Sequence, residues 1–338
     1  MSEQKKLGRQ TYALSAPPTI LGYANVVGKK EGEGPLSATF DLINPDTSFG
    51  EDTWERAERT MQKLALNKAL AKAKKTARDV DLLFAGDLLN QCISSGYAAR
   101  DVEIPFFGLY GACSTMAESL SLAAMALDGG YGTCTAALTS SHFCTAERQY
   151  RTPLEYGAQR TPTAQWTATA AGCVILGREG GSGPRITHVT VGRIRDKGIT
   201  DPSNMGAAMT WAAWDTISTH LKDTGRSSAY YDLIVTGDLG KLGHDLLLEL
   251  FQQDGVDLSG NYEDCGCLLY DREAQDVQCG ASGCGCSASV LTGYLLRGMQ
   301  AGTWQRILFC ATGALHSPTS LGQGENIPGI CHAVAIEL

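Results

Sequence analysis

The sequence lacks three features that would each point to a class of function. No apolar run approaches the roughly 18 residues that a helix needs to cross a bilayer, so we expect any membrane association to come through a partner. Basic residues are not in excess, since Lys and Arg number 28 and Asp and Glu number 36, a formal charge of 28 − 36 = −8. Duplex nucleic acid is bound by basic surfaces, and we therefore expect no nucleic-acid partner. The first residues contain no apolar segment typical of a secretory signal, which predicts an intracellular protein.

Cysteine, by contrast, is abundant, with 12 in 338 residues. In a long chain without a predicted signal, cysteines are more often reduced thiols that pack as small hydrophobic side chains than disulfide partners. The pairs Cys265-Gly-Cys267 and Cys284-Gly-Cys286 have one residue between the cysteines, whereas structural zinc sites usually have two to four. We therefore expect neither a metal site nor a cofactor.

Four segments recur in the same order along the chain, which indicates an internal duplication. The pairs are 81–88 with 232–239, 111–120 with 283–291, 136–142 with 307–316, and 171–176 with 333–338. In the first pair a short apolar run ends in Gly-Asp, at Asp87 and Asp238, and the third pair ends at His142 and His316. The offsets are 238 − 87 = 151 and 316 − 142 = 174. We predict two α/β halves, residues 1–180 and 181–338, each with a mixed sheet and crossover helices.

Helical periodicity predicts helices in five places. These are Phe49–Thr76, Ser114–Leu127, Trp211–Thr224, His244–Gln253 and Ser287–Gly302. Ligands in such folds gather at the carboxyl ends of strands, so we expect Asp87, Asp238, His142 and His316 to face one shared cleft. The segment Cys144–Thr163, rich in charge and aromatic residues, is interpreted as a solvated loop or, alternatively, as a lid or dimer contact.

The turn Gly111-Ala112-Cys113-Ser114, followed by a helix, resembles the nucleophile turn of thiolases and ketoacyl synthases. The resemblance implies the thiolase-like fold, with two pseudo-symmetric halves in a layered α-β-α-β-α arrangement, and it implies a homodimer. In the family the helix start favours the cysteine thiolate. This sequence departs from the ketoacyl synthase III pattern at two catalytic positions. Gly237 stands where the family has histidine, and Cys284 stands where it has asparagine.

A closer resemblance, from one end of the chain to the other, is to the stage V sporulation protein AD family. The segments that carry it are Ala24–Leu36, Ser140–Arg151, Pro162–Thr167, Asp238–His244, Asp264–Gly266 and Ser282–Ala288. The resemblance implies a role in sporulation and germination. It implies binding of dipicolinic acid, either free or as the calcium chelate, and service to the stage V sporulation A membrane proteins that transport it. It also implies a place in the forespore or spore, peripheral to the spore inner membrane through these partners.

A dianion such as dipicolinate is bound by backbone N–H groups, cationic side chains and imidazoles. The predicted ligand-binding residues are Cys113, His142, His316, Lys241, Asp87 and Cys284. Cys113 is interpreted as a vestigial nucleophile, and no residue is predicted to be catalytic. The two histidines could equally be core or loop residues, Lys241 a surface lysine, and Asp87 a helix cap or a calcium contact. We lean to a structural role for Asp238.

Two other functions stay open at this point. One is an acyl-thioester condensing enzyme of the ketoacyl synthase III or thiolase type that uses Cys113 as its nucleophile. The other is a scaffold that tethers partners without using a pocket.

Overall fold

The computed structural model describes residues 5–151, 160–178 and 181–338. Over these residues one large sheet runs in the order β10-β9-β12-β13-β8-β2-β7-β5-β3-β4, and β8 meets β2 at a single residue pair, Thr19 with Arg185. This junction divides the sheet into two sets with the same strand order. The first set is β4 (Phe106–Leu109), β3 (Leu82–Gly86), β5 (Cys134–Ser141), β7 (Ala170–Gly177) and β2 (Thr19–Val27). The second is β10 (Tyr262–Asp264), β9 (Leu233–Thr236), β12 (Arg306–Ala314), β13 (Gly329–Glu337) and β8 (Arg185–Thr190).

The strand directions repeat as well. In the first set β3 pairs in parallel with β4 and β5, whereas β7 pairs antiparallel with β5 and β2. In the second set β9 pairs in parallel with β10 and β12, whereas β13 pairs antiparallel with β12 and β8. The duplication predicted from the sequence is therefore present in the fold, and the Gly-Asp segments end the equivalent strands β3 and β9.

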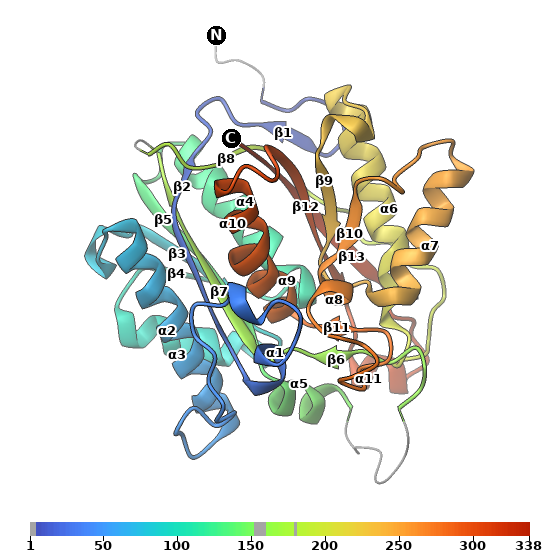
Figure 1. Cartoon of the computed structure of the whole chain (residues 1–338), viewed down its shortest axis with the longest axis horizontal. Helices are drawn as coiled ribbons and strands as arrows, with labels where there is room; N and C mark the ends of the chain where they lie inside the picture. Colours follow the sequence, from blue (N-terminus) through green and yellow to red (C-terminus); the bar gives the residue numbers. More distant parts are fainter. Residues whose placement is uncertain (1–4, 152–159, 179–180) are drawn as a thin grey trace.

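Helices form three layers around the two sets of strands (Figure 1). Between the two sets of strands lie α4 (Thr115–Asp128) and the segment formed by α9 (Cys284–Val290), a π-helical turn (Leu291–Leu295) and α10 (Leu296–Gln300). The outer layers are α2 (Trp54–Ala73) with α3 (Ile93–Val102), and α6 (Met205–Thr224) with α7 (Gly240–Gln253). One cluster of buried hydrophobic side chains surrounds the central helices on both of their faces, and one lies between each set of strands and its outer helices. The layered α-β-α-β-α prediction is confirmed.

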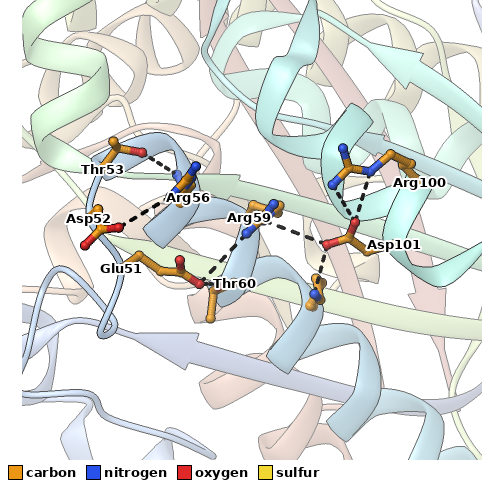
Figure 2. Close-up of polar contacts among 9 residues, drawn as sticks. Glu51, Asp52, Thr53, Arg56, Arg59, Thr60, Arg100 and Asp101 are labelled. Carbon is orange, nitrogen blue, oxygen red and sulfur yellow. Dashed lines mark hydrogen bonds and ion pairs between the residues drawn. The ribbon is translucent and has the colours of Figure 1, made fainter.

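Helix α2 shows how the sequence specifies these layers. Its buried residues recur at helical spacing, as in Ala57, Met61, Ala65 and Ala69, and this face packs on the sheet. Its outer face forms ion pairs with α3 (Figure 2). There Arg59 lies 3.9 Å from both Glu51 and Asp101, and Lys63 and Arg100 lie 2.9 and 2.7 Å from the Asp101 carboxylate. Each exposed pair contributes little alone, about 0.5 kcal/mol, so the apolar face holds the helix in place.

The five predicted helices all exist, with different bounds. Helix α6 begins six residues before the predicted Trp211, at Met205, and α7 begins at Gly240 rather than His244. Periodicity missed α3 and also α5 (Phe143–Tyr150), which lies in the segment interpreted as a loop. The remaining short elements are β1 (Thr11–Ala13), α1 (Lys29–Gly32), β6 (Trp166–Thr167), α8 (Cys265–Leu268), β11 (Ala281–Ser282) and α11 (Pro318–Gly322).

The first strand crosses from one half to the other. Although β1 lies near the start of the chain, it pairs antiparallel with β8, and Asp223 of α6 accepts hydrogen bonds from the Gln10 and Thr11 N–H groups. The boundary at residue 180 stays a prediction, since residues 179 and 180 lie outside the described part of the chain. None of the helices within the described ranges combines the length and apolar character needed to cross a membrane.

Candidate functional site

A cavity of about 430 Å³, part of it open to solvent, lies where the two halves meet at the carboxyl ends of their strands. Its walls come from the loop after β3, the turn before α4, helix α5 and the loops after β11 and β12. The lining residues are Leu88, Ala112, Cys113, Ala146, Tyr150, Arg151, Thr167, Met205, Ser282, Ala314 and His316. Most of this surface is apolar, with a few converging polar groups, as in small-molecule sites. A wider vestibule shares Ala112, Tyr150, Ala314 and His316 with it.

Cys113 lies in the 3-10 turn Ala112–Ser114 that leads into α4. Ala112 adopts a positive φ of 52°, an uncommon conformation for a residue with a side chain, and turns the chain sharply before the cysteine. The side chain of Cys113 is 6% exposed. Its thiol is hydrogen-bonded to the Asp238 carboxyl group. Burial and this carboxylate raise the pKa of the Cys113 thiol well above its usual value, so the stabilised thiolate implied by the family turn is not found here.

Asp238 follows β9 and is fully buried beneath Cys113 and Ser282. Its Oδ2 accepts hydrogen bonds from the Gly283 N–H at 2.8 Å and the Ser282 hydroxyl at 3.4 Å, and its Oδ1 accepts one from the Thr312 hydroxyl at 2.9 Å. Gly283 has a φ of 99°, and a Cβ there would lie 2.7 Å from Ser141 Oγ, so only glycine fits this turn. Burial raises the pKa of Asp238 to about 7 despite the hydrogen bonds that favour its ionised form.

The cationic and aromatic groups of the lining come from α5 and from the loop after β12. Tyr150 and Arg151 lie at the end of α5, and the Tyr150 ring is 5.8 Å from the His316 ring. Arg151 hydrogen-bonds through Nη1 to the buried Glu147 one helical turn earlier. Burial and the nearby Arg151 charge lower the pKa of His316, so its imidazole is neutral at neutral pH.

His142 lies elsewhere. Its Nδ1 accepts the Cys144 N–H, which caps the start of α5, and its Nε2–H donates to the Thr47 carbonyl at 2.8 Å. The ring is also 5.4 Å from Trp54. Both ring nitrogens are therefore used by the backbone, and His142 does not line the cavity. It positions the helix that forms the wall.

Asp87 and Lys241 are also outside the lining. The buried Asp87 carboxylate accepts the Leu89 N–H at 2.9 Å and the Ser95 N–H and hydroxyl at 2.8 and 2.6 Å. Lys241 lies on the exposed side of α7, where its ammonium pairs with Asp245 at 2.6 Å. The shared cleft predicted from the sequence thus includes His316, has Asp238 beneath it, and excludes Asp87 and His142 because local backbone groups bind their polar atoms. Ligand binding by Asp87, His142 and Lys241 stays a prediction that this geometry does not favour.

Cys284 begins α9 and packs with Cys113, Leu88 and Ala146. Its thiol donates to the Ser140 carbonyl at 2.9 Å, so it points into the protein interior. At Gly237 an added Cβ would lie 3.0 Å from the Ala311 Cα and the Thr312 backbone nitrogen, which leaves no room for a histidine without a backbone shift. Neither position offers the side-chain donor found there in condensing enzymes. Across the residues that the structure places, no three His, Cys, Asp or Glu side chains are arranged to hold a metal ion.

Sequence reasoning missed Tyr150, Arg151 and Ser282. The first two lie in the segment interpreted as a loop, and its aromatic and cationic character directly after a strand was the available signal. Ser282 precedes the glycine turn at the equivalent position of the second half. The part of the suggested lid at 152–159 lies outside the described residues.

Comparison with known proteins agrees with this architecture. The family model for stage V sporulation protein AD matches residues 8–337. The chain belongs to the stage V sporulation protein AD family. The stage V sporulation protein AD of Bacillus subtilis (strain 168) is 43% identical over 333 residues, which cover 98% of each protein. The resemblance inferred from the sequence motifs is thereby confirmed, and with it a place among sporulation proteins.

Solved structures with the same fold are condensing enzymes and their relatives. The 3-oxoacyl-[acyl-carrier-protein] synthase III of Aquifex aeolicus VF5 superposes with a TM-score of 0.60 at 12% identity, covering 95% of this chain and 100% of that chain. A variant of OleA from Xanthomonas campestris gives a TM-score of 0.64 at 13% identity, covering 97% and 100%. At such identities the likeness establishes the thiolase-type fold and nothing of the chemistry.

Proposed function

We propose that this chain is a non-catalytic protein of endospore formation that binds dipicolinate, pyridine-2,6-dicarboxylate, in the cavity above Cys113. One observation carries the proposal. A largely apolar cavity, with Arg151 as the cationic side chain of its lining, lies at a cysteine whose pKa is raised by burial and by Asp238. The proposal also draws on the end-to-end family match.

The cavity suits a flat, single-ring dicarboxylate. Leu88, Ala146, Met205 and Ala314 supply apolar walls, and Tyr150 supplies an aromatic ring. It adjoins the wider vestibule, with which it shares Ala112, Tyr150, Ala314 and His316.

Arg151 supplies the charge complement for one carboxylate. Among the residues that the structure describes, Glu147 accepts a hydrogen bond from one terminal nitrogen of Arg151, Nη1, and a guanidinium has five N–H donors in all. Charge-assisted hydrogen bonds of this kind are the strong ones. His316 and the Ser282 hydroxyl border the same space and provide further polar groups for the second carboxylate.

The surroundings of Cys113 support the non-catalytic part. Its thiol has a raised pKa, Cys284 donates away from the cavity, and Gly237 has no space for a side chain. The loss of even one oxyanion donor typically costs about 100- to 1000-fold in rate.

Calorimetric titration of the purified protein with dipicolinate tests the proposal. We expect saturable heat and an affinity lower by about tenfold or more in Arg151→Gln, because a charge-assisted hydrogen bond to the ligand is lost. Lys241→Gln is the matched control, since it removes one cation outside the cavity and should leave the affinity unchanged. Benzene-1,3-dicarboxylate, which lacks the ring nitrogen, reports whether that atom is recognised. The calcium chelate, whose charge is neutralised, should bind more weakly if Arg151 recognises the free dianion. Flat traces with both forms of the ligand would contradict the proposal.

The second candidate is an acyl-thioester condensing enzyme, favoured by one observation, that Cys113 lines the cavity in the fold of such enzymes. It predicts a covalent acyl adduct on Cys113 after incubation with acetyl-CoA or malonyl-CoA, visible in the intact mass and absent in Cys113→Ser. A scaffold without a ligand would instead tolerate every cavity substitution.

We further propose that the chain acts at the spore inner membrane together with the stage V sporulation A membrane proteins, in uptake of dipicolinate and its release on germination. Family membership supports this. We expect the chain to sediment with vesicles that contain these membrane proteins and to stay in solution with protein-free vesicles of the same lipids.

We propose that two copies of the chain form a homodimer through β4, the edge strand of the first set. The edge strand β4 exposes Phe107 at 55% and is followed by Tyr110 at 48%, and an open strand edge readily pairs with a second copy. Light scattering should give twice the monomer mass, and Phe107→Glu should reduce it to the monomer mass.

A further inference from the structure

Asp238 lies under the cavity, and none of the ligand contacts proposed above involves it. Its carboxyl group is fully buried, and its hydrogen-bond partners Cys113 and Ser282 both line the cavity. The carboxyl group is therefore next to two side chains that an occupant of the cavity would contact. Its other partners, the Gly283 N–H and the Thr312 hydroxyl, belong to the start of α9 and to β12.

The charges that face Asp238 are unfavourable for a second anion. Asp264, which caps α8, is a second buried carboxyl group whose charge acts on Asp238. The thiols around the pair belong to Cys113, Cys265, Cys284 and Cys286. Arg151, paired with Glu147, and the imidazole of His316 belong to the cavity lining as well. A dianion in the cavity would thus be attracted by Arg151 and repelled by an ionised carboxyl group beneath Cys113 and Ser282.

We propose that Asp238 is a positioning residue for the ligand: the cavity accepts the dicarboxylate with the Asp238 carboxyl group protonated, so that binding takes up a proton. This inference rests on the proposed function. The carboxyl group already titrates near neutral pH, because burial raises its pKa to about 7, and a nearby dianion raises the pKa further.

Protonation also changes what the cavity offers. An ionised Asp238 accepts the hydrogens of Ser282 and Cys113, so these hydrogens are directed to the carboxylate and not into the cavity. A protonated Asp238 donates its own O–H to Ser282 Oγ or Cys113 Sγ, and the hydrogen of that side chain becomes available to a ligand carboxylate. The proton therefore removes a repulsive charge and adds a donor to the cavity floor. No covalent bond to the ligand forms or breaks.

His316 is the competing proton acceptor, since it borders the cavity and its pKa is lowered by burial and by Arg151. An anion bound beside it would favour its protonation too. The experiment therefore has to separate the two groups.

The test is calorimetric titration with dipicolinate from about pH 6 to about pH 9, in pairs of buffers with different heats of ionisation. The ligand stays a dianion over this range, so a proton that is taken up binds to the protein. In the wild type we expect affinity to fall by up to about tenfold per pH unit above pH 7, with proton uptake approaching one per ligand. Asp238→Asn imitates the protonated form and should bind without uptake and without the pH dependence. His316→Gln should keep both.

Each other outcome is decisive. Binding without proton uptake overturns the role of Asp238 and leaves the proposed function standing. Uptake that persists in Asp238→Asn but disappears in His316→Gln also overturns it, because the proton then binds to His316. Absence of binding heat overturns both proposals. If Asp238→Asn does not fold, Thr312→Val removes a donor to Oδ1 and should move the midpoint of the pH profile upward; an unchanged midpoint counts against the proposal.

Discussion

Each half of the molecule buries a pair of carboxyl groups near the end of an equivalent strand. In the first half Asp87 follows β3 and Glu58 comes from α2. In the second half Asp238 follows β9 and Asp264 follows β10. In each pair one member accepts hydrogen bonds from backbone N–H groups of the loop that follows β3 in the first half and β9 in the second. Asp87 accepts the Leu89 N–H, and Asp264 accepts those of Leu239 and Gly240.

The other member of each pair has a pKa raised to about neutral or above, but the neighbours of the two groups differ. Glu58 is enclosed by the Ser140 and Thr145 hydroxyls at 2.8 and 3.0 Å, whereas Asp238 lies directly beneath the cavity. Burial and the charge of Asp87 raise the pKa of Glu58 to about 8. The comparison teaches that equivalent positions need not keep one role. Asp87 binds the loop after β3, whereas Asp238, at the equivalent position, lies beneath the cavity, and Asp264 binds the loop after β9 instead.

The largest expected effect is the loss of stability on replacing Asp87 or Asp264, the carboxylates that accept the loop N–H groups. Asp87→Ala and Asp264→Ala should each lower the free energy of unfolding by about 3 kcal/mol, because several buried donors lose their acceptor at once. Denaturant unfolding measures this, with the partly exposed Asp101→Ala as the control at about 1 kcal/mol or less. If only one of the two loses stability, the halves are not equivalent in this respect.

Next in size is the pH dependence due to Glu58. Because its pKa in the folded protein is raised, its contribution to stability is complete below its unfolded pKa and is lost as pH rises toward about 8. Glu58→Gln lacks this loss, so relative to the wild type it should gain about 2 kcal/mol between about pH 6 and about pH 8. Unfolding curves at both pH values test the difference, and a constant difference would show that Glu58 does not titrate in this range.

The aspartates of the two Gly-Asp loops should differ in their effect on the reactivity of the Cys113 thiol. Asp238→Asn removes the carboxylate that raises its pKa and should speed alkylation of Cys113 by about tenfold at neutral pH. The fully buried Cys284 serves as an internal reference in the same peptide map. Asp87→Asn is the matched variant in the other half and should leave the rate at Cys113 unchanged.

The two strand-end histidines should separate in a similar way, with a smaller effect. His142→Ala removes a helix cap and should cost about 1 kcal/mol of stability without a direct effect on ligand contacts. His316→Ala should instead weaken dipicolinate binding severalfold with little change in stability. Thermal unfolding measures the stability of both variants, and calorimetry measures their affinity for dipicolinate. A binding loss in His142→Ala or a stability loss in His316→Ala would contradict these roles.

The smallest effect belongs to Lys241. Its ion pair with Asp245 is exposed, so Lys241→Gln should change the free energy of unfolding by less than about 0.5 kcal/mol. A larger loss in denaturant unfolding would mean that α7 depends on this contact.

The sequence predicted the repeat because duplicated strands keep their apolar runs and their polar ends in register. It therefore located the Gly-Asp loops, the turn at Cys113 and both strand-end histidines. It could not predict that the His142 ring bonds Thr47, since that loop is 142 − 47 = 95 residues away in the chain. Nor could periodicity reveal α5, whose eight residues are too few for a helical pattern, so Tyr150 and Arg151 were missed.

The pairing of β1 with β8 has a consequence for how the chain reaches this fold. Thr11 pairs with Thr190, so 190 − 11 = 179 residues separate the partners. During synthesis β1 leaves the ribosome long before its partner β8 does. Strands so far apart in the chain pair slowly. We therefore expect β1 to pair with β8 late in folding, after the first set of strands has formed.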